Sequence, residues 1–486
     1  MKWLGARGPN FYTLLAVLGV AGILRLSLAF RTPAFLEGDS QSYLLPAWDL
    51  FTGQGFSPEI RRAPVYPLLI AAVFSSLGGS LSALAAVQHL VGLGTVACTY
   101  LAANHLFGRF AAAAASLAVA VSGPLLVYER YVMSEAVFTF LVIASLASLL
   151  ISLSRPGVAG LVVAGALLAL ACLTRPLAQA LVPLALITIL LHLPRWRRAL
   201  IGGAAFCVGF LLLFAPWSLR MLAEHGSPGA SGGLGRSLVA RSGKYAPEDF
   251  VDWKWLSETY VGREDREARA RILLYNKRRA IRSSRSVRSY QDALIDEVGV
   301  SAAEADALMR SVGLEAIARR PIEYILDSLR FTGEVLAGIE ISPHSEWKQR
   351  QEKSWTEQWP DRLDALVDPV SAAQQWERPT AEWLLGAFQP SQVSLPLLAL
   401  AALGCLAIVR TSRERYALAL PVSAVALASL SAFLDGPVAR YHNPLEPIVA
   451  LFGAGGLVYL FSLARSFRPT QARSDDSGEP AIQRAS

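Results

Sequence analysis

The chain has 486 residues, of which 53% are hydrophobic and 17% are charged, and its formal net charge is +7. Apolar runs of about 20 residues are long enough to cross the ~30 Å hydrocarbon core of a bilayer, and the many such runs exclude a soluble globular protein. The positive charge does not indicate nucleic-acid binding, because many arginines flank apolar runs, where basic residues set membrane orientation.

The pattern predicts an all-α polytopic membrane protein with about ten transmembrane helices. The apolar runs cover residues 11–30, 83–106, 110–127, 136–153, 157–174, 177–193, 199–216, 392–409, 417–434 and 445–464. A further run at 65–77 is only about 20 Å long as a helix, which is too short to cross comfortably. If it crossed, the basic cluster at 195–198 would face outward, against the positive-inside rule, so we expect this run to lie flat.

With that run flat, the basic clusters beside the spans lie on one side, which the same rule makes cytoplasmic. The predicted parts are an N-terminal transmembrane module (1–216, with a first outer loop at 31–82), an extracytoplasmic loop domain (217–390), C-terminal transmembrane helices (391–468) and a disordered cytoplasmic tail (469–486). We expect interfacial helices in the first outer loop. The large loop is expected to be mainly helical, with its last helix starting at Pro321 and lying along the membrane surface.

Asp39 in the first outer loop has two interpretations. Aspartate is a good N-cap, so Asp39 could cap a short helix that begins there. A partly desolvated carboxylate at the membrane boundary is also suited to take a proton from an attacking hydroxyl, as a general base does.

Several short motifs follow one another along the chain: Asp39-x-x-x-Tyr43, Gly53-x-Gly55, Pro64-x-Tyr66-Pro67, Leu106-Phe107-Gly108-Arg109 and Ser134-Glu135. This series resembles the membrane glycosyltransferases of the C superfamily, particularly the bacterial protein-mannosyltransferase-like and aminoarabinose-transferase-like branch. No single motif is specific; their order and sidedness carry the resemblance. The chain has Arg62-Ala63-Pro64 where many relatives have Glu-Lys-Pro-Pro, which leaves the acceptor open.

The resemblance implies that Asp39 is the catalytic base and that a second acidic site residue falls on Glu135 or, as the second choice, Glu129. Arg175 stands on the outer side, where it would contact lipid head groups or bind the donor phosphate. Arg440 lies in a turn that resembles the Arg-Tyr turn of the family and is the second phosphate candidate. Further candidates for substrate contact are Tyr43, Arg61, Arg62, Tyr66, Tyr441 and His442. Asp39, Glu135 and His442 could together hold a divalent metal, but no close ligand spacing supports one, and the sequence points to no other cofactor.

The leading hypothesis is an inverting hexosyl- or pentosyltransferase at the outer face of the bacterial cytoplasmic (inner) membrane. It would move a sugar from a polyprenyl-phosphate donor to a hydroxyl of a lipid, polysaccharide or protein acceptor, with membrane lipids as its other partners. The resemblance supplies the donor class, whereas charge and sidedness supply the location. A flippase or transporter of lipid-linked saccharides is the first alternative. It would need polar residues near the bilayer midplane, where these spans are almost wholly apolar. A glycan polymer ligase is the second.

Overall fold

The computed structural model describes residues 9–31, 34, 36, 39–56, 62–154, 157–193, 195–226, 228–242, 284–337, 394–411, 415–434 and 439–466. Regular structure in these residues is helical, with no β-strand. Parts of the large outer loop, the predicted tail and the candidate Arg61 lie outside the described residues.

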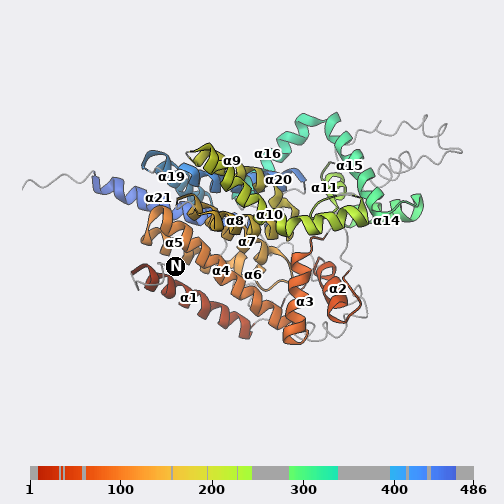
Figure 1. Ribbon diagram of the computed structural model, residues 1–486, viewed down its shortest axis with the longest axis horizontal. Coiled ribbons are helices and arrows are strands. Elements are labelled where there is room, and N and C mark those ends of the chain that lie inside the picture. Colours follow the sequence, from red (N-terminus) through yellow and green to blue (C-terminus); the bar gives the residue numbers. More distant parts are fainter. Residues whose placement is uncertain are drawn as a thin grey trace, which may run out of the picture.

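A bundle of long apolar helices forms most of the molecule (Figure 1). The helices long and apolar enough to cross a membrane are α1 (Pro9–Arg31), α4 (Leu81–Phe107), α7 (Glu135–Ser154), α10 (Trp196–His225), α20 (Ala419–Leu434, with the 3-10 turn Arg415–Leu418 before it) and α21 (Glu446–Ser466). Shorter apolar helices complete the bundle: α5 (Arg109–Ala120), α8 (Val158–Cys172), α9 (Leu181–His192, after the 3-10 turn Pro176–Ala180) and α19 (Ser394–Thr411). The predicted class, a polytopic all-α membrane protein, is confirmed.

Close backbone contact joins α8 to α10. A Cβ on Gly165 of α8 would overlap the Phe206 carbonyl of α10, and a Cβ on Gly209 of α10 would overlap the Val162 carbonyl of α8. Without a hydrophobic driving force between helices in lipid, small residues of this kind allow the backbone approach that holds helices together.

The predicted span 110–127 is wrong as a single helix. Helix α5 ends at Ala120, with Val121 as its C-cap, and a short helix α6 (Gly123–Tyr128) follows. Ser122 accepts a hydrogen bond from the Leu125 N–H at 3.3 Å, and Pro124 occupies the first turn of α6. A serine cap followed by proline starts a new helix, so the continuous hydropathy conceals a change of direction.

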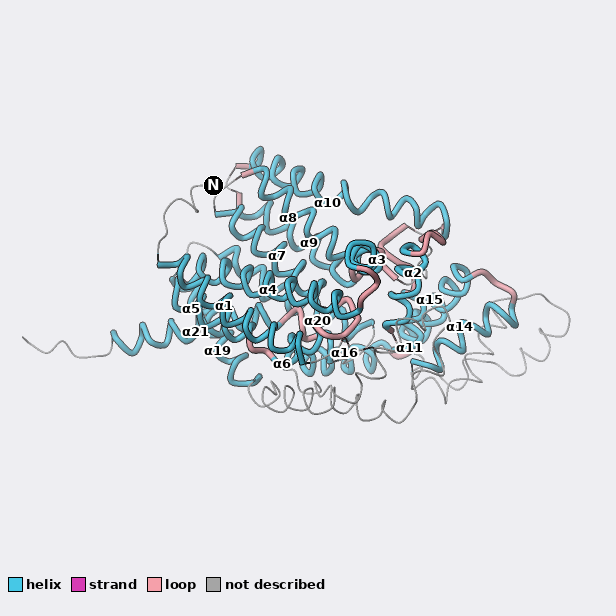
Figure 2. Tube along the Cα trace, turned by 90° about the horizontal axis from the view of Figure 1, so that it is seen from below, coloured by secondary structure: helices cyan, strands magenta, loops and turns pink. Residues whose placement is uncertain are grey.

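The predicted first outer loop contains two short helices, α2 (Ser40–Phe51) and α3 (Val65–Leu77). Figures 1 and 2 show α3 running across the direction of the long helices at one end of the bundle. Helices of the large loop gather at the same end: α11 (Leu234–Ser242), α14 (Ser284–Val298), α15 (Ala302–Arg319) and α16 (Pro321–Ala337). Helix α16 begins at Pro321, the predicted first-turn position.

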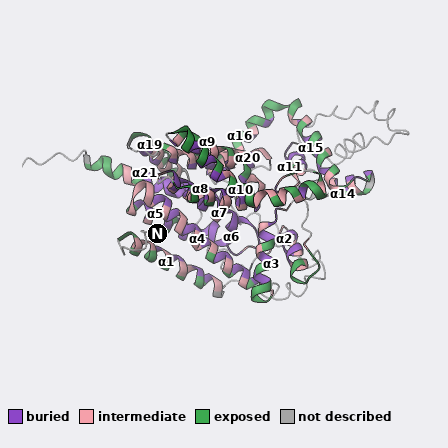
Figure 3. Ribbon diagram, in the orientation of Figure 1, coloured by how far each residue is buried: buried purple, intermediate pink, exposed green. Residues whose placement is uncertain are grey.

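Helix α7 lies at the centre of the bundle, as the buried residues in Figure 3 show. In the apolar 18-residue stretch of α7, 83% of the residues are buried inside the protein, whereas in the corresponding stretch of α1 only 22% are buried. The first residue of α7 is Glu135, so this carboxylate stands at the middle of the end that carries α2 and α3.

Candidate active site

Five charged side chains from separate segments meet at this end of the bundle. Asp39 precedes α2, Arg62 precedes α3, Glu135 begins α7, Arg175 lies between α8 and the following 3-10 turn, and Arg440 lies in the 3-10 turn Ala439–Tyr441. Ion pairs connect all five. Each of the five is a candidate from the sequence, and the structure brings them together.

Asp39 uses both carboxylate oxygens to bind arginines. Its Oδ1 accepts a hydrogen bond from Arg62 Nη2 at 2.7 Å, and its Oδ2 accepts one from Arg440 Nη1 at 3.1 Å. The side chain does not cap α2, although Asp39 occupies the N-cap position. It is 28% exposed, so an incoming molecule can reach it.

Glu135 is the buried partner of the cluster, with its side chain only 1% exposed. Its Oε1 accepts a hydrogen bond from Arg175 Nη2 at 2.6 Å and lies 3.7 Å from Arg440 Nε. Arg175 also donates from Nε to Ser134 Oγ at 3.1 Å. Burial alone would lower the pKa of Arg175, but Glu135, Tyr43 and Tyr441 together outweigh burial and the pKa is raised. Arg175 is therefore a permanent cation.

Aromatic rings support the arginines. The Arg62 guanidinium lies 4.3 Å from the Tyr43 ring centroid and donates from Nη1 to the Tyr43 hydroxyl at 3.0 Å. The Tyr441 ring centroid lies 5.6 Å from Arg175 and 5.9 Å from Arg440. Cation–π contacts at these distances favour one orientation of each guanidinium group.

Two other candidates are buried beside the cluster. Tyr66 is fully buried, and its hydroxyl donates to Gln88 Oε1 at 2.7 Å. His442 Nδ1 lies 2.8 Å from the Val335 carbonyl of α16, so Nδ1 carries a proton and donates it. Burial lowers the pKa of His442 despite this hydrogen bond. Its ring is therefore neutral at pH 7 and connects α16 to the turn that carries Arg440.

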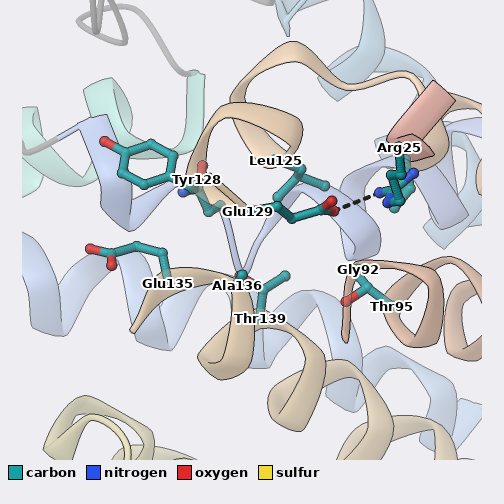
Figure 4. A pocket seen from close by; sticks show the side chains of 11 residues that line it. Arg25, Gly92, Thr95, Leu125, Tyr128, Glu129, Glu135, Ala136 and Thr139 are labelled. Carbon is teal, nitrogen blue, oxygen red and sulfur yellow. Dashed lines mark hydrogen bonds and ion pairs between the residues drawn. The ribbon is translucent and has the colours of Figure 1, made fainter. Parts of the chain in front are cut away.

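Glu129 belongs to a different cluster. Its carboxylate binds Arg25 Nη2 at 2.6 Å and His89 Nδ1 at 2.7 Å, and all three side chains are buried. Figure 4 shows Glu129 and Arg25 pointing toward each other while Glu135 points the opposite way. The cavity between them leaves ≈ 10 Å³ for the centre of a water molecule. That volume is near the minimum for one ordered water and excludes a sugar.

Sequence analysis missed Arg25, Gln88 and His89. Each is a polar residue inside an apolar run, and such residues are costly in a membrane unless they have a partner. A polar residue inside an apolar run was therefore the sequence feature that could have identified them. As for metals, the part of the chain that the structure describes has no group of three His, Cys, Asp or Glu side chains able to hold an ion.

Comparison with known proteins identifies related folds. Residues 61–219 match the model of the dolichyl-phosphate-mannose-protein mannosyltransferase family. No curated protein matches the sequence.

The similar solved structures include an archaeal enzyme in two states and a bacterial enzyme. The oligosaccharyltransferase AglB of Archaeoglobus fulgidus, in complex with an inhibitory peptide and a dolichol-phosphate, has 12% identity and a TM-score of 0.52, covering 94% of this chain and 51% of that chain. The apo oligosaccharyltransferase of the same organism has 13% identity and a TM-score of 0.51, covering 96% and 52%. ArnT of Cupriavidus metallidurans bound to undecaprenyl phosphate has 17% identity and a TM-score of 0.39, covering 94% and 80%.

The chain spans about half the length of the archaeal enzymes that it matches. At these identities the archaeal likeness establishes the fold alone, and the family model matches the part of the chain that carries Arg62, Glu135 and Arg175. The resemblance expected from the sequence motifs is confirmed at this level.

Proposed function

We propose that this chain is an inverting glycosyltransferase that moves a sugar from a polyprenyl-phosphate donor to an acceptor hydroxyl. The observation that carries the proposal is the position of Arg440, which contacts both the accessible Asp39 and the buried Glu135. Arg440 thus contacts the potential base, Asp39, and its guanidinium group is itself suited to bind an anionic substrate.

Exposure distinguishes the two carboxylates. Asp39 is 28% exposed and is the general base, whereas Glu135 is 1% exposed and orients Arg175 and Arg440. The acceptor oxygen attacks the anomeric carbon opposite the phosphate while its proton passes to Asp39. The bond between the anomeric carbon and the phosphate oxygen breaks, and polyprenyl phosphate leaves as an anion that needs charge stabilisation and no strong acid.

Arg440 connects donor binding to activation of the base. Its Nη1 binds Asp39 Oδ2. A donor phosphate that binds Arg440 and Arg175 competes for this guanidinium and releases one oxygen of Asp39. The oxygen that loses its bond to Arg440 accepts the hydroxyl proton, which ties proton removal to the presence of donor.

The charge balance favours a donor with one phosphate. Three guanidinium groups face two carboxylates, which leaves these five side chains with one excess positive charge. A sugar joined to a lipid through one phosphate carries one negative charge and neutralises the excess.

The location follows from the fold and the charge pattern. The cluster lies at the end of the bundle opposite the basic residues beside the spans, such as Arg109 and Arg415. By the positive-inside rule this end faces the outside of the bacterial inner membrane. The acceptor is then a hydroxyl of a lipid, polysaccharide or protein on that side.

Replacing Asp39 by Asn tests the proposal. Membranes of a deletion strain, which contain the natural acceptor, receive the purified protein and a polyprenyl-phosphate donor with a labelled sugar. Loss of a general base typically lowers the rate by 10²–10⁴-fold, so transfer by Asp39→Asn should fall by about that factor. Asp49→Asn, a carboxylate change on the same helix α2, is the matched control.

Two results would count against the proposal. Full activity of Asp39→Asn would remove the proposed base, and transfer only from oligosaccharide-diphosphate donors would indicate a polymer ligase.

A further inference from the structure

Gln88 of α4 makes three hydrogen bonds inside the protein, where its side chain is fully buried. Its Oε1 accepts from the Tyr66 hydroxyl at 2.7 Å, and its Nε2 donates to the carbonyls of Glu129 at 3.0 Å and Tyr131 at 2.9 Å. Both N–H donors and the acceptor oxygen of the amide therefore have partners. An apolar side chain of similar size would leave all three partners without this contact.

One side of Gln88 leads to the first outer loop. The Tyr66 ring packs edge-on against Tyr43, with ring centroids 5.0 Å apart. The Tyr43 hydroxyl lies 3.2 Å from Ser134 Oγ and accepts a hydrogen bond from Arg62. Arg62 in turn binds Asp39. Gln88 is thus connected to the proposed base through buried rings and short hydrogen bonds.

The other side of Gln88 leads to the second outer loop, residues 128–135. The carbonyls it binds belong to Glu129 and Tyr131, a few residues before Glu135. The Glu129 side chain also holds this turn in place, because Arg25 and His89 bind its carboxylate. Gln88 therefore stands between the loop that holds Asp39 and the loop that holds Glu135.

We propose that Gln88 is a positioning residue for the transfer reaction, fixing the separation of the two outer loops so that Asp39 and Glu135 can both bind Arg440. The inference rests on the proposed function, since it concerns the alignment of the proposed base with the phosphate-binding arginines. Gln88 itself contacts no reacting group. Its replacement should lower kcat more than it changes donor KM, because Arg175 keeps its own bonds to Ser134 and Glu135.

The experiment compares Gln88→Leu, Tyr66→Phe and the matched control Thr99→Val in the transfer assay. Thr99 is also buried in α4, but its hydroxyl donates only to the Thr95 carbonyl of the same helix. A displacement of about 1 Å can cost 10²-fold, so we expect kcat of Gln88→Leu to fall by about 100-fold. Tyr66→Phe should fall less, and the double variant should match Gln88→Leu because both changes break one connection.

Hydrogen exchange supplies a second readout that does not need activity. Amides of residues 129–135 should exchange faster in Gln88→Leu than in the wild type and remain unchanged in Thr99→Val. Wild-type kcat together with wild-type exchange in Gln88→Leu would overturn the positioning role. If Gln88→Leu does not fold, Tyr66→Phe decides by the same two measurements. An inactive wild type would contradict the proposed transfer alone, and exchange would still decide whether Gln88 holds the loops.

Discussion

Arg440 Nη1 donates a hydrogen bond to Asp39 Oδ2 at 3.1 Å across 401 positions of sequence. The same guanidinium approaches Glu135, so it joins the first outer loop to the start of the central helix α7. The candidate site is therefore completed by the C-terminal part of the chain, which lies outside the segment that matches the family model.

Substitution of Arg440 should weaken transfer in a graded way. Arg440→Ala removes a cation from the phosphate site, and kcat/KM for a polyprenyl-phosphate sugar should fall by about 10²–10³-fold, as for other lost transition-state donors. Arg440→Lys keeps the charge but not the planar fork that reaches two carboxylates, so it should lie between Ala and wild type. Arg415→Ala, an exposed arginine at the other end of the bundle, is the control. Wild-type kcat/KM in Arg440→Lys would refute the geometric part of this argument.

The Glu135–Arg175 pair should show strong coupling in stability. Removing one partner of a buried pair leaves an uncompensated charge and typically costs about 3–5 kcal/mol. Because Arg175 is 12% exposed and Arg440 lies near Glu135, the lower end of that range is expected for Glu135→Gln and Arg175→Gln. The double variant should lose less than the sum of the singles, with a coupling of at least about 1 kcal/mol. Free energies of unfolding in detergent measure this coupling, and additive losses would show that the pair is independent.

Sequence patterns predicted the spans because hydrocarbon thickness fixes the length of an apolar helix. They also placed the candidate residues on one side, because basic residues mark the other. Which guanidinium meets which carboxylate was beyond prediction: Arg62 was named only as a contact candidate, yet it binds Asp39. Such pairing depends on how α3 packs on the bundle. The hydrophobic periodicity of a single sequence does not show that packing.

Single polar residues inside apolar runs were the other omission. Gln88 and His89 barely lower the mean hydropathy of a long span, so a window average passes over them. Their partners, Tyr66 and Glu129, lie about 20 to 40 residues away. The helix break at Ser122 was not predicted for the same reason, because a serine cap starts a new helix without interrupting the run of apolar residues.

Gly92→Ala should destabilise the protein through the Glu129 cluster. An added Cβ would overlap the Glu129 carboxylate, which cannot move freely because Arg25 and His89 hold it at 2.6 and 2.7 Å. Overpacking of this kind costs about 1–3 kcal/mol. Gly203→Ala in α10 is the control, because nothing lies within 4 Å of its Cβ position and alanine is the better helix former. The midpoint of unfolding in detergent should fall for the first variant only, and a fall in both would point to a general effect of alanine.

His442 should make stability depend on pH in mildly acidic solution. Burial lowers its folded-state pKa below the ordinary value of about 6.5, so the unfolded chain binds the proton more readily. The stabilisation is therefore fully present above pH 6.5 and is lost as the pH falls from there toward the folded-state pKa. The slope is at most about 1.4 kcal/mol per pH unit for one histidine.

Comparison with His442→Gln isolates this contribution. Glutamine retains a donor toward the Val335 carbonyl but does not titrate, so the difference in unfolding free energy between wild type and variant should shrink below pH 6.5. Measurements between pH 5 and pH 8 in one detergent give this difference directly. A constant difference across that range would show that His442 does not titrate there. A difference that grew on acidification would mean that the folded protein binds the proton better, contrary to its burial.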